Sequence, residues 1–220
     1  MILVNDVHKR YMTRQGAGDW VLRGISMTIP ARRSVGLVGQ NGAGKSTLLR
    51  IIGGADYPTH GFVERRCRVS WPMGNGGLEG TLTGRQNAKF VCRVHGRHHE
   101  LPTLIERIQD FAELGKYFDQ PVQTYSSGMR ARLQFALSLS FDFDVYISDE
   151  VTSAGDVAFR RKASQAFKDL AHKSSIIMVA HDDATLKNFC SSGILLLEGQ
   201  AYWFDNIDDA LFAYKDSLKL

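Results

Sequence analysis

The sequence is poor in cysteine and proline, with three and five residues among 220, and it has no long hydrophobic run. Cys67, Cys92 and Cys190 are far apart and odd in number, which argues against a disulfide framework or a zinc site and favours a reducing compartment. The apolar runs are much shorter than the about 20 residues of a membrane-spanning helix. We therefore expect a chain that does not cross a membrane, and its apolar start, residues 1–4, is too short for a secretory signal.

The chain also lacks a strong charge of one sign. It carries 27 basic and 23 acidic residues, a net charge of +4, and 44% of its residues are hydrophobic. A chain of this size can bury a core and form one domain with a sub-lobe. A nucleotide, an anionic membrane surface and a nucleic acid would each suit the small positive excess, so charge does not choose among them.

The most informative segment is GQNGAGKST, residues 39–47, which lies between an apolar run at 35–38 and a helix-like run at 48–52. This context predicts a phosphate-binding loop. Its glycines leave backbone N–H groups free to close around phosphate oxygens. Lys45 adds a positive charge toward the β- and γ-phosphates, Ser46 offers a hydroxyl to Mg²⁺, and the following helix directs its positive end at the anion.

A second motif is VYISDE, residues 145–150, an apolar strand that ends in two carboxylates. Asp149 is placed to hold Mg²⁺, and Glu150, which points in another direction, is placed to activate a water molecule against the γ-phosphate. The alternative is an acidic turn after an edge strand.

A third motif is YSSGMRARLQFALSLSF, residues 125–141, in which a serine- and glycine-rich turn opens a helix. Ser126 is suited to cap that helix and Gly128 permits close backbone approach, so the helix start is a candidate second anion site. Two anion sites in one chain point to a phosphate shared between subunits. Taken alone, the pattern is equally typical of a capped amphipathic helix packed by Leu133 and Leu137.

Short apolar runs near both ends predict the buried parallel strands of an α/β sheet. Between about Gly74 and Phe141, apolar residues recur at helical spacing, which predicts a helical lobe inserted into that core. We expect strands at residues 2–7, 25–29, 35–38, 145–148, 176–179 and 194–197, and helices after the phosphate loop and at 85–94, 104–111, 129–140 and 159–171.

The motifs occur in the order GQNGAGKST, YSSGM, YISDE, SAGD (residues 153–156) and His181. In this order they resemble the ATP-binding subunit of ABC transporters over essentially the whole chain. YSSGMRARLQFALSLS, DEVTSAGD, and SWPMG with TLTGRQN are most similar to the ATPases that export capsular polysaccharide. The resemblance implies an α/β P-loop NTPase core of ABC type, with an N-terminal antiparallel β region and an inserted helical subdomain. We expect a single domain, 1–220, with the core at about 1–73 and 142–220 and the helical subdomain at about 74–141.

The resemblance also implies roles for individual residues. Tyr11 matches an aromatic residue that stacks on adenine, although a core tyrosine is the alternative. Glu150 matches the general base and His181 the switch histidine, which act together with Lys45; Ser46 and Asp149 match the magnesium positions. The implied nucleotide contacts are Tyr11, Gly39, Asn41, Gly42, Ala43, Gly44, Lys45, Ser46 and Thr47 within one subunit, and Ser126, Ser127, Gly128, Met129 and Asp156, of which the signature loop 126–129 contacts the γ-phosphate held by the opposite subunit.

The chain departs from the family pattern at two places. Ser127, Gly128 and Met129 stand where most members have two glycines and a glutamine. The glutamine that usually joins the metal site to the transmembrane partner has no counterpart at residues 68–73, where Trp71 and Pro72 stand. Gln86, farther along in a helical pattern, is not assigned that role.

We therefore expect an ATPase with ATP and Mg²⁺ as cofactors, working as a homodimer with a separate transmembrane permease. It would lie at the cytoplasmic face of the inner membrane, bound through the permease, and drive capsular polysaccharide export; no nucleic acid partner is expected. The runner-up is an ABC-type ATPase acting on nucleic acid or ribosomes, followed by a small-molecule kinase. A metal site at His95, His98 and His99, and nucleic-acid or lipid binding by the basic clusters near Arg65 and Arg160, are weaker alternatives.

Overall fold

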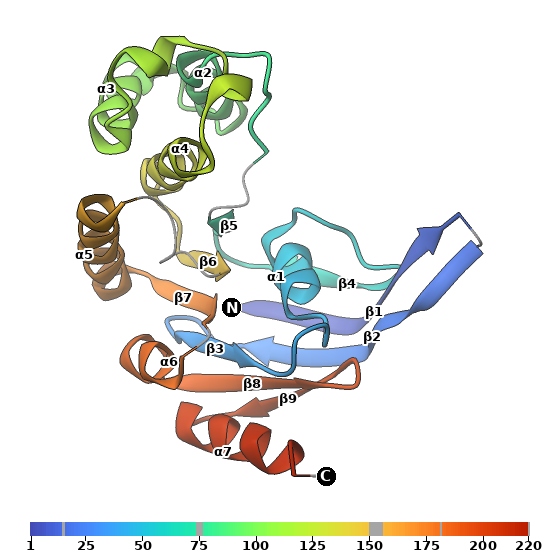
Figure 1. The fold of residues 1–220 in the computed structure, drawn as a ribbon. Coiled ribbons are helices and arrows are strands. Elements are labelled where there is room, and N and C mark those ends of the chain that lie inside the picture. The colour runs from blue at the N-terminus through green and yellow to red at the C-terminus, as the bar shows by residue number, and fades with distance from the viewer. Residues whose placement is uncertain (15, 74–76, 150–155, 181, 220) are drawn as a thin grey trace. The chain divides into compact units, whose positions relative to one another are not determined.

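The computed structural model describes residues 1–14, 16–73, 77–149, 156–180 and 182–219 (Figure 1). The chain divides into two compact units. The first, called the core unit, comprises Met1–Pro72, Phe143–Glu150 and Leu170–Leu220, and the second, called the helical unit, comprises Met73–Asp142 and Val151–Asp169. No helix within these described residues is both long enough and apolar enough to cross a membrane.

The core unit contains a three-stranded sheet in the order β2-β1-β4, with β1 at Ile2–Thr13, β2 at Gly16–Ile29 and β4 at His60–Arg65. β1 pairs antiparallel with both neighbours. Its buried side chains alternate at Ile2 and Val4, and the register then shifts before Val7. Asp6 has a φ of 46° at this shift, so the irregularity returns Val7 to the buried face.

The second sheet has six strands in the order β5-β6-β7-β3-β8-β9. β6, β7, β3 and β8 pair in parallel, and β3 and β7 are buried along their whole length, as continuously apolar parallel strands should be. β9 is antiparallel to β8, and the turn between them has positive φ at both Glu198 and Gly199. The strands are β5 (Val69–Met73), β6 (Val145–Asp149), β7 (Ser175–Val179), β3 (Val35–Val38), β8 (Ser192–Leu197) and β9 (Gln200–Phe204).

Three helices of the core unit pack against these sheets: α1 (Lys45–Gly53), α6 (Asp183–Phe189) and α7 (Ile207–Ser217). The core cluster joins buried α1 residues to apolar residues of both sheets. α7 lies so close to β8 that a Cβ added at Gly193 would stand 2.3 Å from the Cβ of Ala210. α6 and α7 are also joined by ion pairs from Lys187 to Asp208 and from Lys215 to Asp183.

The helical unit contains α2 (Gly84–Val94), α3 (Leu101–Ala112), α4 (Ser127–Leu139) and the part of α5 (Val157–Lys173) up to Asp169, with short 3₁₀ turns at His98–Glu100, Gly115–Asp119 and Val122–Thr124. α2 begins with a capping box in which Thr83 accepts from Gln86 N–H and the Gln86 side chain accepts from Thr83 N–H. Phe111, Phe135 and Phe159 bring α3, α4 and α5 together, with ring centroids 5.8–6.3 Å apart.

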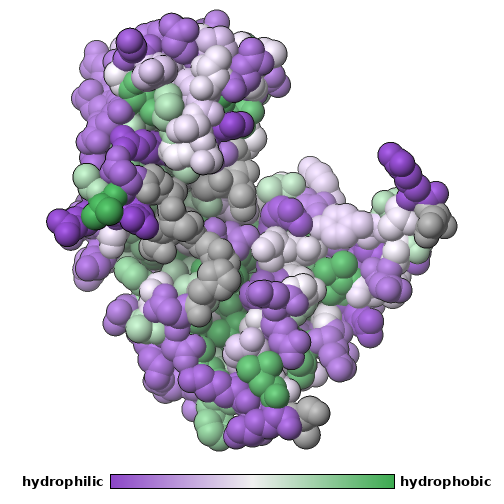
Figure 2. Space-filling model, viewed as in Figure 1, coloured by the Kyte–Doolittle hydropathy of each residue, from purple (hydrophilic) through white to green (hydrophobic). Residues whose placement is uncertain are grey.

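The expected strands and helices all correspond to elements of the structure, but their ends differ. α4 begins at Ser127, two residues before the expected start, because Ser126 caps it. The sequence reasoning missed two strands, β4 and β9, and two helices, α6 and α7. It also did not assign β5, which lies at the edge of its sheet, a place where a strand tolerates Pro72. On the face drawn in Figure 2 the described surface is mostly hydrophilic, with hydrophobic residues in small separate groups.

Candidate functional site

The phosphate loop connects β3 to α1, and its glycines all adopt conformations that side chains disfavour. φ is 149° at Gly39, 83° at Gly42 and 100° at Gly44. A Cβ at Gly39 would stand 2.4 Å from the carbonyl oxygen of Leu196, and one at Gly44 would stand 2.9 Å from Val21 Cγ1. A side chain at Gly39 or Gly44 would collide with neighbouring atoms, and the positive φ at all three glycines is unfavourable for residues with a side chain. The loop conformation therefore requires glycine at these positions.

Lys45 lies at the first position of α1, and its ammonium turns back across the loop. Its Nζ donates to the carbonyl oxygens of Gly39 and Gln40, at 2.7 and 2.8 Å. The N-cap residue of α1 is Gly44, which supplies no side-chain cap. Because the cap residue has no side chain, the first N–H groups of α1 and the Lys45 ammonium are suited to bind an anion together.

A cavity of about 350 Å³ in the core unit opens beside this loop. Asn41, Ser46 and Thr47 line it from the loop and α1, and Asp149 lines it from the end of β6. β6 lies between β5 and β7, so the two carboxylates do not follow an edge strand. The cavity brings together the hydroxyls of Ser46 and Thr47 and the carboxylate of Asp149, oxygen donors of the kind that Mg²⁺ binds alongside nucleotide phosphates. These residue types fit the predicted metal.

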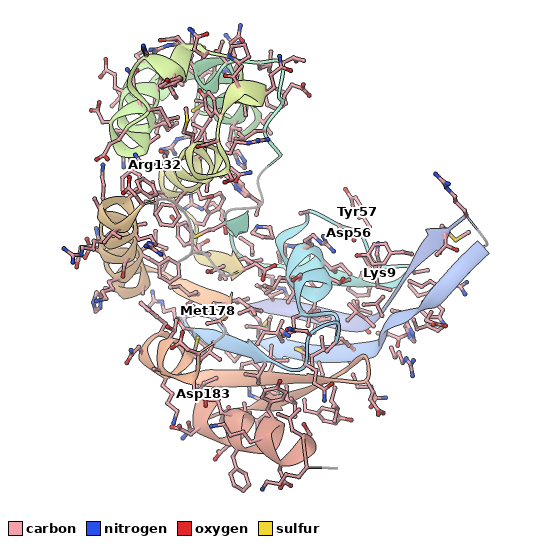
Figure 3. The ribbon with its side chains drawn as sticks, viewed as in Figure 1. Lys9, Asp56, Tyr57, Arg132, Met178 and Asp183 are labelled. Carbon is pink, nitrogen blue, oxygen red and sulfur yellow. The ribbon has the colours of Figure 1, made fainter. Side chains whose placement is uncertain are left out.

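Tyr11 lies near the end of β1, and it is not a core residue, because 39% of its surface is exposed. The core-tyrosine alternative is therefore wrong. Its hydroxyl lies 3.3 Å from Oγ1 of Thr47, which follows Ser46 in α1. The neighbouring Lys9, labelled with Asp56 and Tyr57 in Figure 3, has its Nζ 4.8 Å from the centre of the Tyr11 ring.

The turn before α4 belongs to the helical unit. Ser126 has extended backbone and its Oγ accepts the backbone N–H of Met129 at 3.2 Å, so the predicted helix cap is confirmed. The C-terminal half of α4 is buried in the unit's core, with Leu133 and Leu137 among its buried residues. A cavity of about 670 Å³ lies in front of the turn, and its lining includes Ser126, Ser127, Gly128, Met129, Arg132, Tyr117, Glu113 and Asp156.

Arg132 is a residue of this cavity that the sequence reasoning missed (Figure 3). Its guanidinium pairs with Asp156, lies 3.9 Å from a Glu113 oxygen, and stands 4.9 Å from the centre of the Phe159 ring. Backbone N–H donation from Phe159, followed by the charge of Arg132, holds the pKa of Asp156 below its ordinary value. No sequence pattern signals a pair separated by 24 residues.

The structure also shows what surrounds Trp71, which stands in the segment that lacks the family's usual glutamine, and where Gln86 lies. Trp71 lies in β5, with its ring 5.5 Å from that of Phe143 in an edge-to-face contact. Gln86 is engaged in the cap of α2. His95 packs on Phe141 with ring centroids 4.9 Å apart, and burial lowers its pKa.

Glu150, His181 and residues 153–155 of the SAGD motif lie outside the described residues.

The comparisons with known proteins agree on one family. The family model described as "ABC transporter" matches residues 22–153. The polysialic acid transport ATP-binding protein KpsT of Escherichia coli is 45% identical, over 99% of this chain and 100% of that protein. The capsule polysaccharide export ATP-binding protein CtrD of Neisseria meningitidis serogroup B is 41% identical, over 99% of this chain and 100% of that protein.

A solved dimeric ATP-binding cassette with ADP and phosphate bound has a TM-score of 0.74, at 22% identity, over 94% of this chain and 99% of its own. At that identity the likeness concerns the fold, and it confirms the predicted ABC-type α/β fold. The resemblance inferred from the motif order is confirmed as well. Since the family model matches more than half of the chain and both relatives match over their full length, the chain belongs to the ABC transporter family.

Proposed function

We propose that this chain is the ATP-hydrolysing subunit of an ABC transporter that exports capsular polysaccharide. ATP hydrolysis is characteristic of the family to which the chain belongs. The two relatives named above are transport and export proteins, and they give no support to a role on nucleic acid or ribosomes. The observation that carries the proposal is that one chain holds both a glycine-built phosphate loop and a serine-capped turn facing a second cavity.

The phosphate-loop cavity holds the triphosphate in this proposal. Backbone N–H groups of residues 39–47 and the Lys45 ammonium bind the phosphate oxygens, after the ammonium leaves its two carbonyl acceptors. Ser46 and Asp149 would hold Mg²⁺, and the bound ion would supply positive charge to the phosphates. Glu150 orients and deprotonates the attacking water, and His181 hydrogen-bonds the γ-phosphate; both roles rest on the motif order.

The second cavity acts on the nucleotide of a partner subunit. In a head-to-tail homodimer, Ser126, Ser127, Gly128 and Met129, with Asp156 nearby, contact the γ-phosphate held by the other copy. ATP binding then closes the dimer and hydrolysis reopens it. A separate transmembrane permease that grips the helical unit converts this motion into transport. The subunit is held at the cytoplasmic face of the inner membrane through that permease.

The test replaces Lys45 in the cells that make the protein. Lys45→Ala is expected to abolish ATP turnover by the purified protein and polysaccharide at the cell surface, because the charge at the phosphate site is lost. Lys219→Ala is the matched control, since Lys219 is an exposed lysine whose Nζ lies 3.4 Å from Asp216. Unchanged surface polysaccharide in cells carrying only Lys45→Ala would rule out the export role, and membrane fractions should contain the chain together with its permease.

A further inference from the structure

The hydroxyl of Tyr11 is fully engaged, although its residue is half exposed. It donates to Oδ2 of Asp56 at 3.1 Å, and it accepts from Nη2 of Arg50 at 3.2 Å. With Thr47 Oγ1 at 3.3 Å as the remaining neighbour, one donor and two acceptor positions are filled, which is the full capacity of a phenol. The far end of this side chain is therefore fixed, while 39% of the residue's surface remains exposed.

Asp56 connects this anchor to a partly buried ion pair. Its Oδ1 accepts from Lys9 Nζ at 2.7 Å and from the backbone N–H of Tyr57 at 2.7 Å. Lys9 Nζ also donates to the carbonyl oxygen of Tyr57 at 2.7 Å. The Lys9 and Asp56 side chains are only 11% and 23% exposed, and Figure 3 shows Lys9, Asp56 and Tyr57 together beside α1.

Lys9 also contacts the ring itself. Its Nζ lies 4.8 Å from the ring centre of Tyr11, which is within the range of a cation–π interaction. The ring is thus held at its hydroxyl by Asp56 and at its π system by the ammonium that Asp56 neutralises. Holding an exposed aromatic side chain in one orientation before a ligand arrives removes an entropic cost of binding.

The same anchor fixes the ring relative to the phosphate loop. Thr47, which contacts the Tyr11 hydroxyl, lines the phosphate-loop cavity next to Ser46. When the phosphates of a nucleotide lie in that cavity, its planar base needs a binding surface nearby. An exposed aromatic ring can provide one by stacking on the base. The position of the ring next to this cavity matches that use.

We propose that Lys9 and Asp56 are positioning residues that hold the ring of Tyr11 as a preformed platform for the base of the bound nucleotide. The inference rests on the proposed function, because it assigns a role beside the same phosphate loop. Lys9 and Asp56 act through Tyr11 and do not touch the nucleotide.

The experiment compares a ligand that has a base with one that lacks it. Dissociation constants of the purified full chain are measured for MgATP and for magnesium tripolyphosphate. Tyr11→Ala should weaken MgATP binding by about 5- to 100-fold, the usual worth of base stacking, and change tripolyphosphate binding by less than about twofold. Asp56→Asn, Lys9→Met and Tyr11→Phe should each weaken MgATP by about three- to tenfold with tripolyphosphate again unchanged, since they loosen the ring without removing it.

Matched controls come from the same unit. Tyr202→Phe and Tyr202→Ala change another partly exposed tyrosine, whose hydroxyl bonds Gln200 at 2.9 Å on β9. Glu64→Gln neutralises another carboxylate, which pairs with Arg66. These variants should bind both ligands as the unaltered protein does. The double variant Tyr11→Phe with Asp56→Asn should bind MgATP about as weakly as either single variant, because both changes act on one anchor.

Each outcome separates the alternatives. If Tyr11→Ala binds MgATP with the affinity of the unaltered chain, the ring of Tyr11 is not a platform for the base. If the unaltered chain binds neither ligand, the proposed function is wrong. Normal MgATP binding by Asp56→Asn and Tyr11→Phe, with weak binding by Tyr11→Ala, would overturn the positioning roles and leave the proposed function standing. Equal weakening toward both ligands would make Asp56 a brace of the phosphate loop and also overturn the inference. If Asp56→Asn unfolds, the MgATP affinity of Tyr11→Phe decides whether the anchored hydroxyl positions the ring, because this change removes only one oxygen.

Discussion

The phosphate loop of the core unit and the turn before α4 of the helical unit both present backbone N–H groups at a helix start, but they are fixed by different forces. Steric limits fix the first, since a side chain at Gly39 would collide with the carbonyl of Leu196. Hydrogen bonds and charges fix the second, through the Ser126 cap and the pairing of Arg132 with Asp156. The two sites should therefore tolerate substitution unequally.

The largest effect is expected at the sterically fixed site. Gly39→Ala should lower the free energy of unfolding by more than about 2 kcal/mol, because the added Cβ meets a backbone oxygen at 2.4 Å and φ is 149°. ATP binding should be lost with the loop conformation. Chemical denaturation measures the first quantity. Gly77→Ala is the control, since a Cβ there meets no atom of the described residues within 4 Å, and equal stability of the two variants would show that steric limits do not fix the loop.

A smaller effect is expected where charges fix the site. Arg132→Met should lower the free energy of unfolding by about 1 kcal/mol, because the pairing carboxylates of Glu113 and Asp156 are largely exposed. ATP affinity should stay within about twofold, since the phosphate loop belongs to the other unit. Turnover should fall about tenfold because the turn and Asp156 lose their common anchor.

The control for that change is Arg107→Met, an exposed arginine of α3 with no ion pair to any described residue. Steady-state ATP hydrolysis gives the turnover, and denaturation gives the stability. An Arg132→Met protein with normal turnover would reduce the Arg132 cluster to a surface ion pair.

The cap of α4 allows stability and chemistry to be separated. Ser126→Ala should cost about 1 kcal/mol of unfolding free energy, whereas Ser126→Gly should cost a few tenths. Both remove the hydroxyl, so both should slow ATP turnover if that hydroxyl contacts a partner's nucleotide. Comparing the two variants by denaturation and by ATP hydrolysis makes the distinction. Full turnover in Ser126→Gly would leave Ser126 with only its capping role.

The smallest effect concerns pH and the Asp56 anchor. Burial raises the pKa of Asp56, but hydrogen bonds from Lys9, Tyr57 N–H and Tyr11 outweigh it and hold the pKa below its ordinary value. A carboxyl with a lowered folded-state pKa stabilises the fold above its unfolded pKa, and this contribution is lost as pH falls through the folded value. The stability difference between the unaltered chain and Asp56→Asn should therefore be constant near neutral pH and shrink below about pH 4. Urea denaturation across this range measures it, and a difference that grew on acidification would reverse the assignment.

The same contrast explains what the sequence could predict. The phosphate loop is local, so glycine spacing between a buried strand and a helix identifies it, and its φ values follow. The cap of α4 is local too, and Ser126 was predicted correctly. Helical periodicity predicted α2 and α3, because each buries one face on its unit; α4 was also predicted, although its residues 135–138 are buried consecutively.

Contacts between segments far apart in the chain leave no local spacing pattern in the sequence. Arg132 meets Asp156 across 24 residues, and Lys9 meets Asp56 across 47, without any spacing rule that joins them. β5 was not predicted, because Pro72 within it disfavours a strand unless its edge position is known. Side-chain partners set by tertiary packing therefore required the structure.

The central claim is that two copies of the chain complete each other's nucleotide site. The structure of the Glu150→Gln protein loaded with ATP and Mg²⁺ tests it most directly, since loss of the general base should slow hydrolysis by about 10²- to 10⁴-fold and preserve the bound nucleotide. We predict a closed dimer in which Ser126 Oγ and Gly128 N–H of one subunit lie about 2.7–3.2 Å from γ-phosphate oxygens that Lys45 of the other subunit holds. A closed, ATP-loaded assembly in which Ser126 and Gly128 lie far from any nucleotide would contradict the account.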